Sequence, residues 1–351
     1  PMRNVFLAVV CCALSTLARS AGTPEALYAE LPLLESPLLS PDGMRYACQV
    51  SVGGKSVFEI VSISPEGGRP LTLGLADDQE LLGWHWVNDD WLLLRIATTL
   101  KAEGETFRVT RAFGVSARDL KIVQIARNRA GQNGADLLWI ARDGSPRVLL
   151  AIQQSIYLNE ETFYPEVFEV DVSTGNMVSR ARPQTGVMDW YADAQGNVRM
   201  GIGYSDTSRK ARLLYRDRNG ETFRVIDKAS GRSGESLTIP ALFLAEPGKA
   251  LVYDDQDGYN ALYELDLATL QTGRKVFGVP GYDIGGHISD PTGGGLLGVN
   301  YTDNRLRHQW FDPVVAKAQR DLEKAAGAGK SVHIISMSRN QRQLIRSEER
   351  R

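Results

Sequence analysis

Residues 36–63 read SPLLSPDGMRYACQVSVGGKSVFEIVSI, and this stretch decides the fold. Two runs rich in β-branched and aromatic residues follow the turn signal Pro41-Asp42-Gly43. Runs of this kind, bounded by turn residues, are typical of short antiparallel strands. Together with GGRPLTLG at residues 67–74, the stretch predicts a unit of strand, turn, strand, loop and further strands.

The same kind of unit recurs along the chain at a spacing of roughly 45 residues, which is typical of four-stranded propeller blades. The later units cover residues 80–125, 134–181, 186–227, 239–278 and 283–313, and residues 331–338 begin one more. A pair of β-sandwiches also has closely spaced strands, but it does not require this period. We therefore predict an all-β protein, a β-propeller of about six complete four-stranded blades plus the start of a seventh.

One surface helix is predicted at about residues 312–326, with the sequence DPVVAKAQRDLEKAA. Asp312 can cap its N-terminus, Pro313 suits the first turn, and Gly327 ends it. The apolar face that we expect to lie against the propeller consists of Val314, Ala318, Leu322 and Ala325.

The N-terminus resembles a secretory signal peptide over residues 1–21. Arg3 precedes an apolar run at residues 5–14, which is shorter than the roughly 20 residues that span a membrane. Removal of this segment would leave Cys48 as the single cysteine, so no internal disulfide is expected. We predict a periplasmic or secreted protein with no membrane span after signal removal and a propeller domain at 27–345. A core helix or strand at the domain edge is the alternative for residues 5–14.

Charge excludes two classes of partner. The 351 residues include 40 basic and 42 acidic ones, which gives a net charge of −2. Binding to nucleic acid or to anionic membranes would favour an excess of Lys and Arg. We expect a peptide or protein partner instead.

No pattern for serine catalysis is present. A nucleophile elbow would read Gly-x-Ser-x-Gly, and the segments around Ser116 and Ser205 come closest but lack the second glycine. His85, between two tryptophans, is expected to be packed and hydrogen-bonded. His287 follows two glycines, which predicts an inner strand near the central channel, and it joins Asp283 as the only hint of chemistry there. His308 and His333 are expected to be ordinary strand positions.

Metal and phosphate motifs are also missing. No two histidines have metal-ligand spacing, and Cys48 has no partner cysteine after signal removal. The acidic clusters at 77–78, 88–90 and 254–257 lack the full calcium-loop pattern, so we interpret them as solvated turns. The glycines at 293–295 precede a predicted strand and not a helix, unlike a phosphate loop. We predict no catalytic, cofactor-binding or metal-binding residue.

Several segments together resemble a known family. They are SPDGMRYACQV, GGKSVFEIVSI, LLGWHWVNDDWLLL, WFDPVVAKAQRDLEKAA and SVHIISMSRNQRQLI. Over residues 27–345 the chain resembles the N-terminal propeller of secreted bacterial prolyl-oligopeptidase-like serine peptidases, a group that includes dipeptidyl aminopeptidases and acylaminoacyl peptidases. The resemblance implies a seven- or eight-bladed propeller that covers an α/β-hydrolase domain and filters peptides. In that family the catalytic triad belongs to the hydrolase domain, so no catalytic residue is implied in this chain.

The last residues depart from the family pattern, because RSEERR at 346–351 stands where family members continue. We expect a truncated or frameshifted product with a non-native charged tail, an open last blade, and marginal stability or self-association through the open edge. The leading hypothesis is a non-catalytic, substrate-gating propeller without peptidase activity of its own. The alternatives are a stand-alone periplasmic propeller that binds a protein or peptide, and an enzyme with channel-facing catalytic residues.

Overall fold

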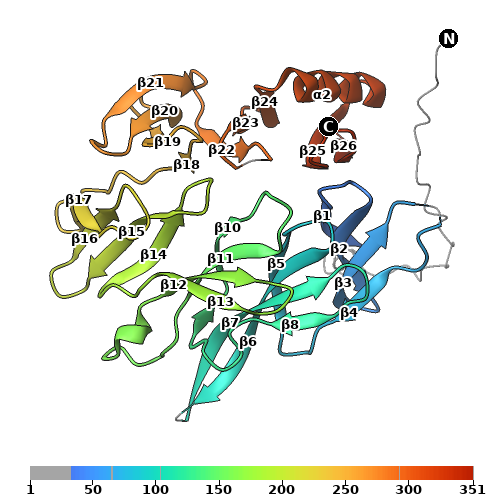
Figure 1. The fold of residues 1–351 in the computed structure, drawn as a ribbon. Helices are drawn as coiled ribbons and strands as arrows, with labels where there is room; N and C mark the ends of the chain where they lie inside the picture. Colours follow the sequence, from blue (N-terminus) through green and yellow to red (C-terminus); the bar gives the residue numbers. More distant parts are fainter. Residues whose placement is uncertain (1–32, 65, 103, 292, 351) are drawn as a thin grey trace, which may run out of the picture.

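The structure is a computed structural model that describes residues 33–64, 66–102, 104–291 and 293–350. The predicted signal peptide at residues 1–21 lies outside these ranges and stays a prediction. Within them, seven antiparallel sheets follow one another around a ring, as Figure 1 shows. The fold is the predicted β-propeller. In these ranges no helix has the length and apolar character needed to cross a membrane.

The first three sheets contain the predicted first three units. The first sheet holds β1 (Leu34–Leu39), β2 (Arg45–Val52), β3 (Lys55–Ser62) and β4 (Leu71–Gly74). The second holds β5 (Glu80–Trp86), β6 (Trp91–Ala102), β7 (Glu105–Ser116) and β8 (Ile122–Gln124), and β9 (Asn133–Gly134) pairs in parallel with β7. The third holds β10 (Asp136–Ile140), β11 (Arg147–Ile152), β12 (Glu166–Asp171) and β13 (Met177–Ala181), with the short 3-10 helix η1 (Glu161–Phe163) between β11 and β12.

The later sheets become smaller along the chain. The fourth sheet holds β14 (Val187–Ala192), β15 (Val198–Ser205), β16 (Lys210–Tyr215) and β17 (Arg224–Ser230). The fifth holds β18 (Leu242–Phe243), β19 (Lys249–Asp254), β20 (Ala261–Asp266) and β21 (Thr272–Phe277). The sixth holds β22 (Ile284–Ser289), β23 (Leu296–Thr302) and β24 (Leu306–Trp310), and the seventh holds β25 (Lys330–Met337) and β26 (Leu344–Arg350). The sixth sheet stops at three strands because the chain leaves β24 to form helix α2 (Pro313–Ala326).

One hydrogen-bonded turn repeats in all seven sheets. In each, a backbone N–H at or just after the end of the first strand donates to a carbonyl at or just before the start of the second. The donor–acceptor pairs are Ser40–Arg45, Val87–Trp91, Ala141–Arg147, Asp193–Asn197, Leu244–Lys249, Asp290–Gly295 and Ser338–Gln343. The seventh sheet therefore repeats the same unit as the other six, although it has two strands.

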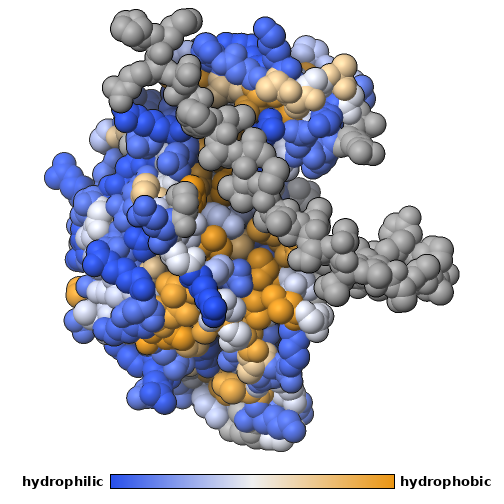
Figure 2. Space-filling model, turned by 90° about the vertical axis from the view of Figure 1, so that its right-hand side faces the viewer, coloured by the Kyte–Doolittle hydropathy of each residue, from blue (hydrophilic) through white to orange (hydrophobic). Residues whose placement is uncertain are grey.

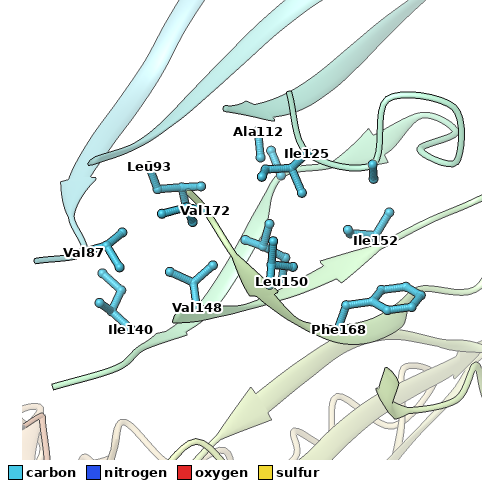
Figure 3. Packing of buried hydrophobic residues seen from close by; sticks show 13 residues of the cluster. Val87, Leu93, Ala112, Ile125, Ile140, Val148, Leu150, Ile152, Phe168 and Val172 are labelled. Atoms are coloured by element: carbon cyan, nitrogen blue, oxygen red, sulfur yellow. The ribbon is translucent and has the colours of Figure 1, made fainter. Parts of the chain in front are cut away.

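Hydrophobic cores lie between successive sheets. Side chains alternate between the two faces of a strand. The second strand of each sheet therefore packs one set of side chains on the preceding sheet and the other set on the following sheet. Figure 3 shows the cluster between the second and third sheets, where Leu93 and Ile125 meet Val148, Leu150 and Phe168. Leu149 and Ala151, on the opposite face of β11, pack on the fourth sheet instead. This alternation explains why the strands are apolar on both faces.

Helix α2 begins as predicted, and the predicted apolar face is confirmed only in part, because Leu322 packs against the neighbouring sheets but Val314 does not. The Asp312 carboxylate accepts hydrogen bonds from the N–H groups of Val314 and Val315 at 2.8 and 3.0 Å, and Gly327 ends the helix at a φ of 84°. Val314, predicted to be buried, is 60% exposed, whereas Val315 and Gln319 are buried. Val315 belongs to a hydrophobic cluster with Trp310 and Ile334, and the Gln319 amide donates to the Val332 carbonyl at 2.8 Å, so this face lies toward β25.

The ring closes where the first and last sheets meet, which we call the seam. Strand β1 contacts β5 on one side and β25 on the other, as Figure 1 also shows. The Leu39 N–H donates to Ser336 Oγ at 3.0 Å, and the Arg339 N–H donates to the Pro41 carbonyl at 2.8 Å. Among the described residues, six buried clusters join the sheets in sequence, and none joins the seventh sheet to the first.

The charged run at 346–350 lies within strand β26, where the sequence analysis expected a separate tail. Its residues pair with β25 from Ser347 opposite His333 to Arg350 opposite Lys330. Opposite charges support this pairing, because Glu348 forms ion pairs with Lys330 and Arg346. On an edge strand, exposed charges also disfavour pairing with a second molecule.

Exposed hydrophobic residues are visible on the side of the molecule that Figure 2 turns toward the viewer. The first sheet lies on this side in Figure 1. It contributes exposed hydrophobic side chains, namely Leu34, Met44, Val52 and Ile63. Self-association remains a prediction.

The seam generates a test of stability. Ser336→Ala removes the acceptor for the N–H of Leu39, a residue that is 6% exposed. We expect the free energy of unfolding to fall by about 1–3 kcal/mol, because a buried donor then has no partner. Denaturant unfolding followed by tryptophan fluorescence measures the change.

The matched control is Ser347→Ala on β26, since the Ser347 side chain makes no hydrogen bond within the described residues. A loss of stability no larger for Ser336→Ala than for Ser347→Ala would contradict a closed seam.

Candidate binding site in the central channel

Two cavities lie at the centre of the ring, with volumes of about 410 and 440 Å³. Together they are lined by residues from the first strand of every sheet. These residues include Leu39, Trp86, Ile140, Tyr191, Leu242, Ile288 and Met337. Arg142 and Ser289 line both cavities, so the two adjoin at this point. The seven first strands therefore enclose a central channel.

The end of the channel where the first strands finish has charges of both signs, with Arg142, Arg339 and Asp290 in the lining of the first cavity. Arg142 follows β10, and its guanidinium makes no hydrogen bond to another described residue. Burial lowers the pKa of Arg142, the Arg339 charge lowers it further, and Asp290 opposes both effects. Trp86 and Trp310 add apolar walls at this end. An anionic group entering the channel would thus meet an unpaired guanidinium beside aromatic surface.

Acidic groups lie toward the end where the first strands begin. Asp136 at the start of β10 and Asp189 on β14 both line the second cavity and a third one of about 310 Å³, which Arg95 also lines. Burial raises the pKa of Asp136, Arg95 opposes this, and the Asp189 charge adds to it. Neither carboxylate makes a hydrogen bond or ion pair within the described residues, and Arg95 Nε is buried without a partner there.

The channel therefore has an electrostatic direction. Asp136 and Arg142 stand six positions apart in the sequence, on β10 and just after it. This separation corresponds to at most about 20 Å of extended chain. A molecule with a cationic group at one end and an anionic group at the other would fit in one orientation, with the cation near Asp136 and Asp189 and the anion near Arg142.

The two residues that gave the only hint of channel chemistry make contacts between neighbouring sheets. His287 lies on β22, the first strand of its sheet as expected, but its Nδ1 lies 2.9 Å from the Tyr253 hydroxyl on β19. The Asp283 carboxylate accepts a hydrogen bond from the Asn260 N–H at 2.6 Å. Both residues thus join the fifth and sixth sheets, and the structure does not bring them together as a catalytic pair.

The other histidines differ from expectation in their contacts. His85 lies on β5 between the buried Trp84 and Trp86, but its imidazole has no hydrogen bond to the described residues. Burial and the charges of Arg95 and Arg142 lower its pKa to about 4. His308 and His333 occupy strands β24 and β25 as predicted, and the structure brings their Nδ1 atoms to 3.5 Å from each other.

The serines of the two incomplete elbow motifs are not arranged for catalysis. Ser116 Oγ accepts a hydrogen bond from the Arg118 N–H at 3.2 Å, and Ser205 Oγ accepts one from the Ser208 N–H at 3.4 Å. Neither contacts a histidine within the described residues. Both hydroxyls stabilise local turns.

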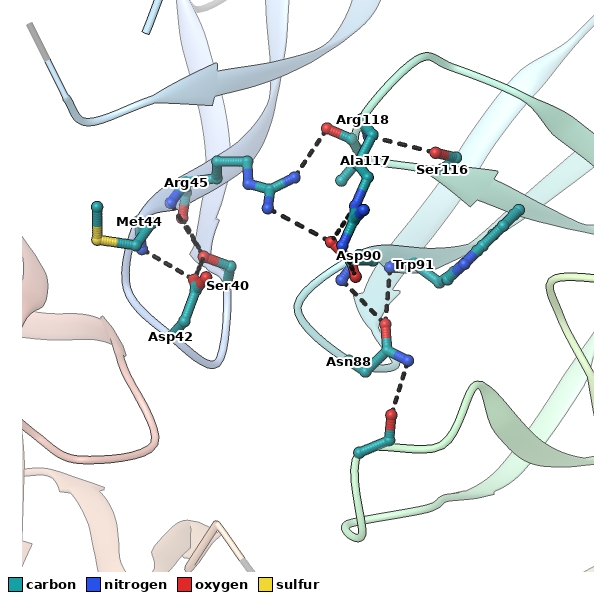
Figure 4. A network of polar contacts seen from close by, with 11 residues as sticks. Ser40, Asp42, Met44, Arg45, Asn88, Asp90, Trp91, Ser116, Ala117 and Arg118 are labelled. Atoms are coloured by element: carbon teal, nitrogen blue, oxygen red, sulfur yellow. Dashed lines mark hydrogen bonds and ion pairs between the residues drawn. The ribbon is translucent and has the colours of Figure 1, made fainter. Parts of the chain in front are cut away.

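The acidic cluster at 88–90 belongs to a polar network between turns, as Figure 4 shows. Asp90 accepts from Arg118 at 2.6 and 2.8 Å and lies 3.6 Å from the Arg45 guanidinium, and the hydrogen bond from Arg118 is the main cause that lowers its pKa. Asn88 donates to the Gly144 carbonyl at 2.9 Å. The cluster therefore links the first three sheets, which agrees with its interpretation as a turn.

Sequence reasoning missed Arg95, Asp136, Arg142 and Asp189. A signal for the two carboxylates was present, because each lies seven or eight residues before the glycine of the first turn in its unit, at Gly144 and Gly196. Alignment of the third and fourth units would have placed both near the axis of the ring.

Comparisons with known proteins found similar structures only at low sequence identity. No protein-family model matches the sequence, and no curated protein is a significant match. Among solved structures, the chain is similar to oligopeptidase B from Leishmania major, with a TM-score of 0.48 and 10% identity, over 89% of this chain and 45% of that one. It is also similar to acylaminoacyl peptidase from Pyrococcus horikoshii, with a TM-score of 0.43 and 12% identity, over 82% and 47% of the two chains.

A third similar structure is TolB from Acinetobacter baumannii, with a TM-score of 0.37 and 11% identity, over 69% of this chain and 55% of that one. The matched part of each of these proteins is about half of its length. At such identities, the activities in their names are properties of those proteins.

The half-buried imidazole of His85 generates a test of pH dependence. A histidine that takes up its proton near pH 6.5 when unfolded, but only near pH 4 when folded, favours the unfolded state as the pH falls between these values. We expect the wild type to lose about 2 kcal/mol more unfolding free energy than His85→Gln between pH 7 and pH 4.5.

Denaturant unfolding of both proteins at a series of pH values measures this difference. The other titrating groups are common to both proteins, so they cancel in the comparison. Parallel pH profiles would show that His85 is accessible to protons in the folded channel.

Proposed function

We propose that this chain is a non-catalytic propeller that binds peptide segments in its central channel and admits them to a partner α/β-hydrolase domain. The observation that supports the proposal is the arrangement of unpaired charges in the channel, with Arg142 at one end and Asp136 and Asp189 at the other. A peptide has a carboxylate at one terminus and an amine at the other, so it complements this arrangement.

The chemistry of each end fits one terminus. A guanidinium presents several N–H donors in a plane and binds a carboxylate through two of them. An amine, which is a donor only, suits the two aspartates with their free acceptor oxygens. Cavities of 410 and 440 Å³ lie within the range of about 300–1,000 Å³ that is typical of ligand sites.

The gating part of the proposal rests on the resemblance to prolyl-oligopeptidase-like propellers. In this role the propeller selects extended peptides by the width and charge of its channel, and the nucleophile belongs to the partner domain. The N-terminal sequence pattern supports the further proposal that this activity belongs to the periplasm or the cell exterior.

A stand-alone peptide- or protein-binding propeller is the second candidate, and one observation favours it. The first strands of all seven sheets line the channel, and β1 meets β25 through hydrogen bonds at the seam. A closed ring can present its binding site without support from another domain.

Peptide binding tests the proposal through Arg142. We use the hexapeptide Gly-Ala-Gly-Ala-Gly-Phe as the free acid and as the C-terminal amide, because six extended residues span about 20 Å. The wild type should bind the free acid at least about tenfold more tightly, since hydrogen bonds to charged groups contribute about 1.5–3 kcal/mol. Isothermal titration calorimetry measures both affinities.

Arg142→Gln should bind the acid and the amide equally. The control Arg182→Gln replaces an exposed arginine outside the channel and should keep the preference of the wild type. Equal binding of the two peptides by the wild type, or binding of neither, would refute a site for the peptide carboxylate.

A further inference from the structure

A fourth cavity lies outside the channel, where the sixth sheet, helix α2 and the seventh sheet meet. Its volume is about 220 Å³. His308 from β24, Gln319 and Glu323 from α2, and His333 from β25 are among its lining residues. The channel function does not use any of these side chains, so their arrangement needs a separate explanation.

Two imidazoles face each other in this cavity. Their Nδ1 atoms are 3.5 Å apart, and the ring planes are inclined at 59°. The His308 ring is stacked on Trp310, and His333 is 7% exposed, so both rings are held by packing. A separation of 3.5 Å is long for a hydrogen bond between two nitrogens, which is usually near 3 Å.

The separation fits a shared cation better. Zinc binds imidazole nitrogens at about 2.0–2.1 Å in tetrahedral geometry, which places two such nitrogens about 3.4 Å apart. No hydrogen atom between the rings is needed in that arrangement, because each neutral imidazole offers a lone pair.

Gln319 supplies an independent observation. It is 7% exposed, and its Nε2 donates to the Val332 carbonyl at 2.8 Å and to the Glu323 carboxylate at 2.9 Å. These two acceptors fix the orientation of the amide, because only its nitrogen can donate. Its Oε1 is buried and has no hydrogen-bond partner within the described residues. Buried polar atoms are nearly always paired, so this oxygen, on a residue that lines the cavity, is available to a ligand.

The charges around the cavity tolerate a cation. Glu323 brings a carboxylate, and the Arg307 guanidinium is already paired with Asp303 at 3.1 Å. Arg305 also lines the cavity, and its charge opposes that of a bound cation. The described residues contain no group of three or more His, Cys, Asp or Glu side chains suited to a metal. A cation here would therefore depend on two imidazoles, an amide oxygen and water.

We propose that His308 Nδ1, His333 Nδ1 and Gln319 Oε1 form a binding site for a divalent transition-metal cation of the zinc, nickel or copper class. Imidazole nitrogen is a preferred ligand of these ions, and an oxygen ligand is compatible with them. The cation connects β24, α2 and β25. It therefore stabilises the two-stranded seventh sheet beside the seam. Among the described residues, no hydrophobic cluster joins this sheet to the first sheet.

Zinc titration of the full chain, stripped of metal with a chelator, tests the site. His308→Gln should lose one Zn²⁺ site of the wild type, or bind Zn²⁺ at that site at least about tenfold more weakly. Mutation of a residue that only supports a metal ligand typically lowers metal affinity 10–100-fold, and loss of a ligand should cost no less. The thermal midpoint of the wild type should rise with Zn²⁺ and that of His308→Gln should not. The matched control His287→Gln removes a histidine elsewhere and should behave as the wild type.

A second measurement does not depend on a variant. Crystals of the wild type soaked in Zn²⁺ should show an anomalous peak between the two imidazoles. Equal zinc affinity of the wild type and His308→Gln overturns the proposal, and so does a crystal with no peak at this position. Either result would leave the two histidines as a hydrogen-bonded pair only.

Discussion

Burial of each sheet between two neighbours is the constraint on which this structure depends. A propeller sheet has two apolar faces and cannot cover either of them alone. Six clusters of buried residues satisfy this constraint from the first sheet to the seventh within the described residues. The seam has no cluster of its own there, and backbone hydrogen bonds to Ser336 and Pro41 connect the two sheets instead. The channel exists because the ring closes at this joint.

Much of the fold could be predicted from the sequence, because its determinants are local. The turn signal Pro41-Asp42-Gly43 marks the first hairpin of the first unit. Runs of β-branched and aromatic residues between turn signals mark the strands. The start of α2 followed from Asp312 and Pro313. The buried face of this helix followed only in part, because the burial of Val315 and Gln319 depends on contacts with β24 and β25.

The site could be predicted only in part, because it depends on the closed ring. His287 was placed correctly on an inner strand, but its bond to Tyr253 comes from a neighbouring sheet. Asp136 and Asp189 are 53 positions apart in the sequence and meet because β10 and β14 occupy the same place in successive sheets. The pair of His308 and His333 likewise joins two units. Motif spacing within a segment does not report such contacts.

The seam also determines how the ring can move. A joint of hydrogen bonds without a hydrophobic cluster opens at lower free energy than a hydrophobic core, so we expect local opening to begin there. Separation of β1 from β25 would widen the ring into a C-shape while every sheet keeps its strands and the six cores stay buried. Bulky polypeptide could then enter the channel from the side, through the wall of the ring, as well as along its axis. The ring would then open and close at one joint, the seam between β1 and β25. The extent of opening at this seam would determine the largest molecule that can enter the channel.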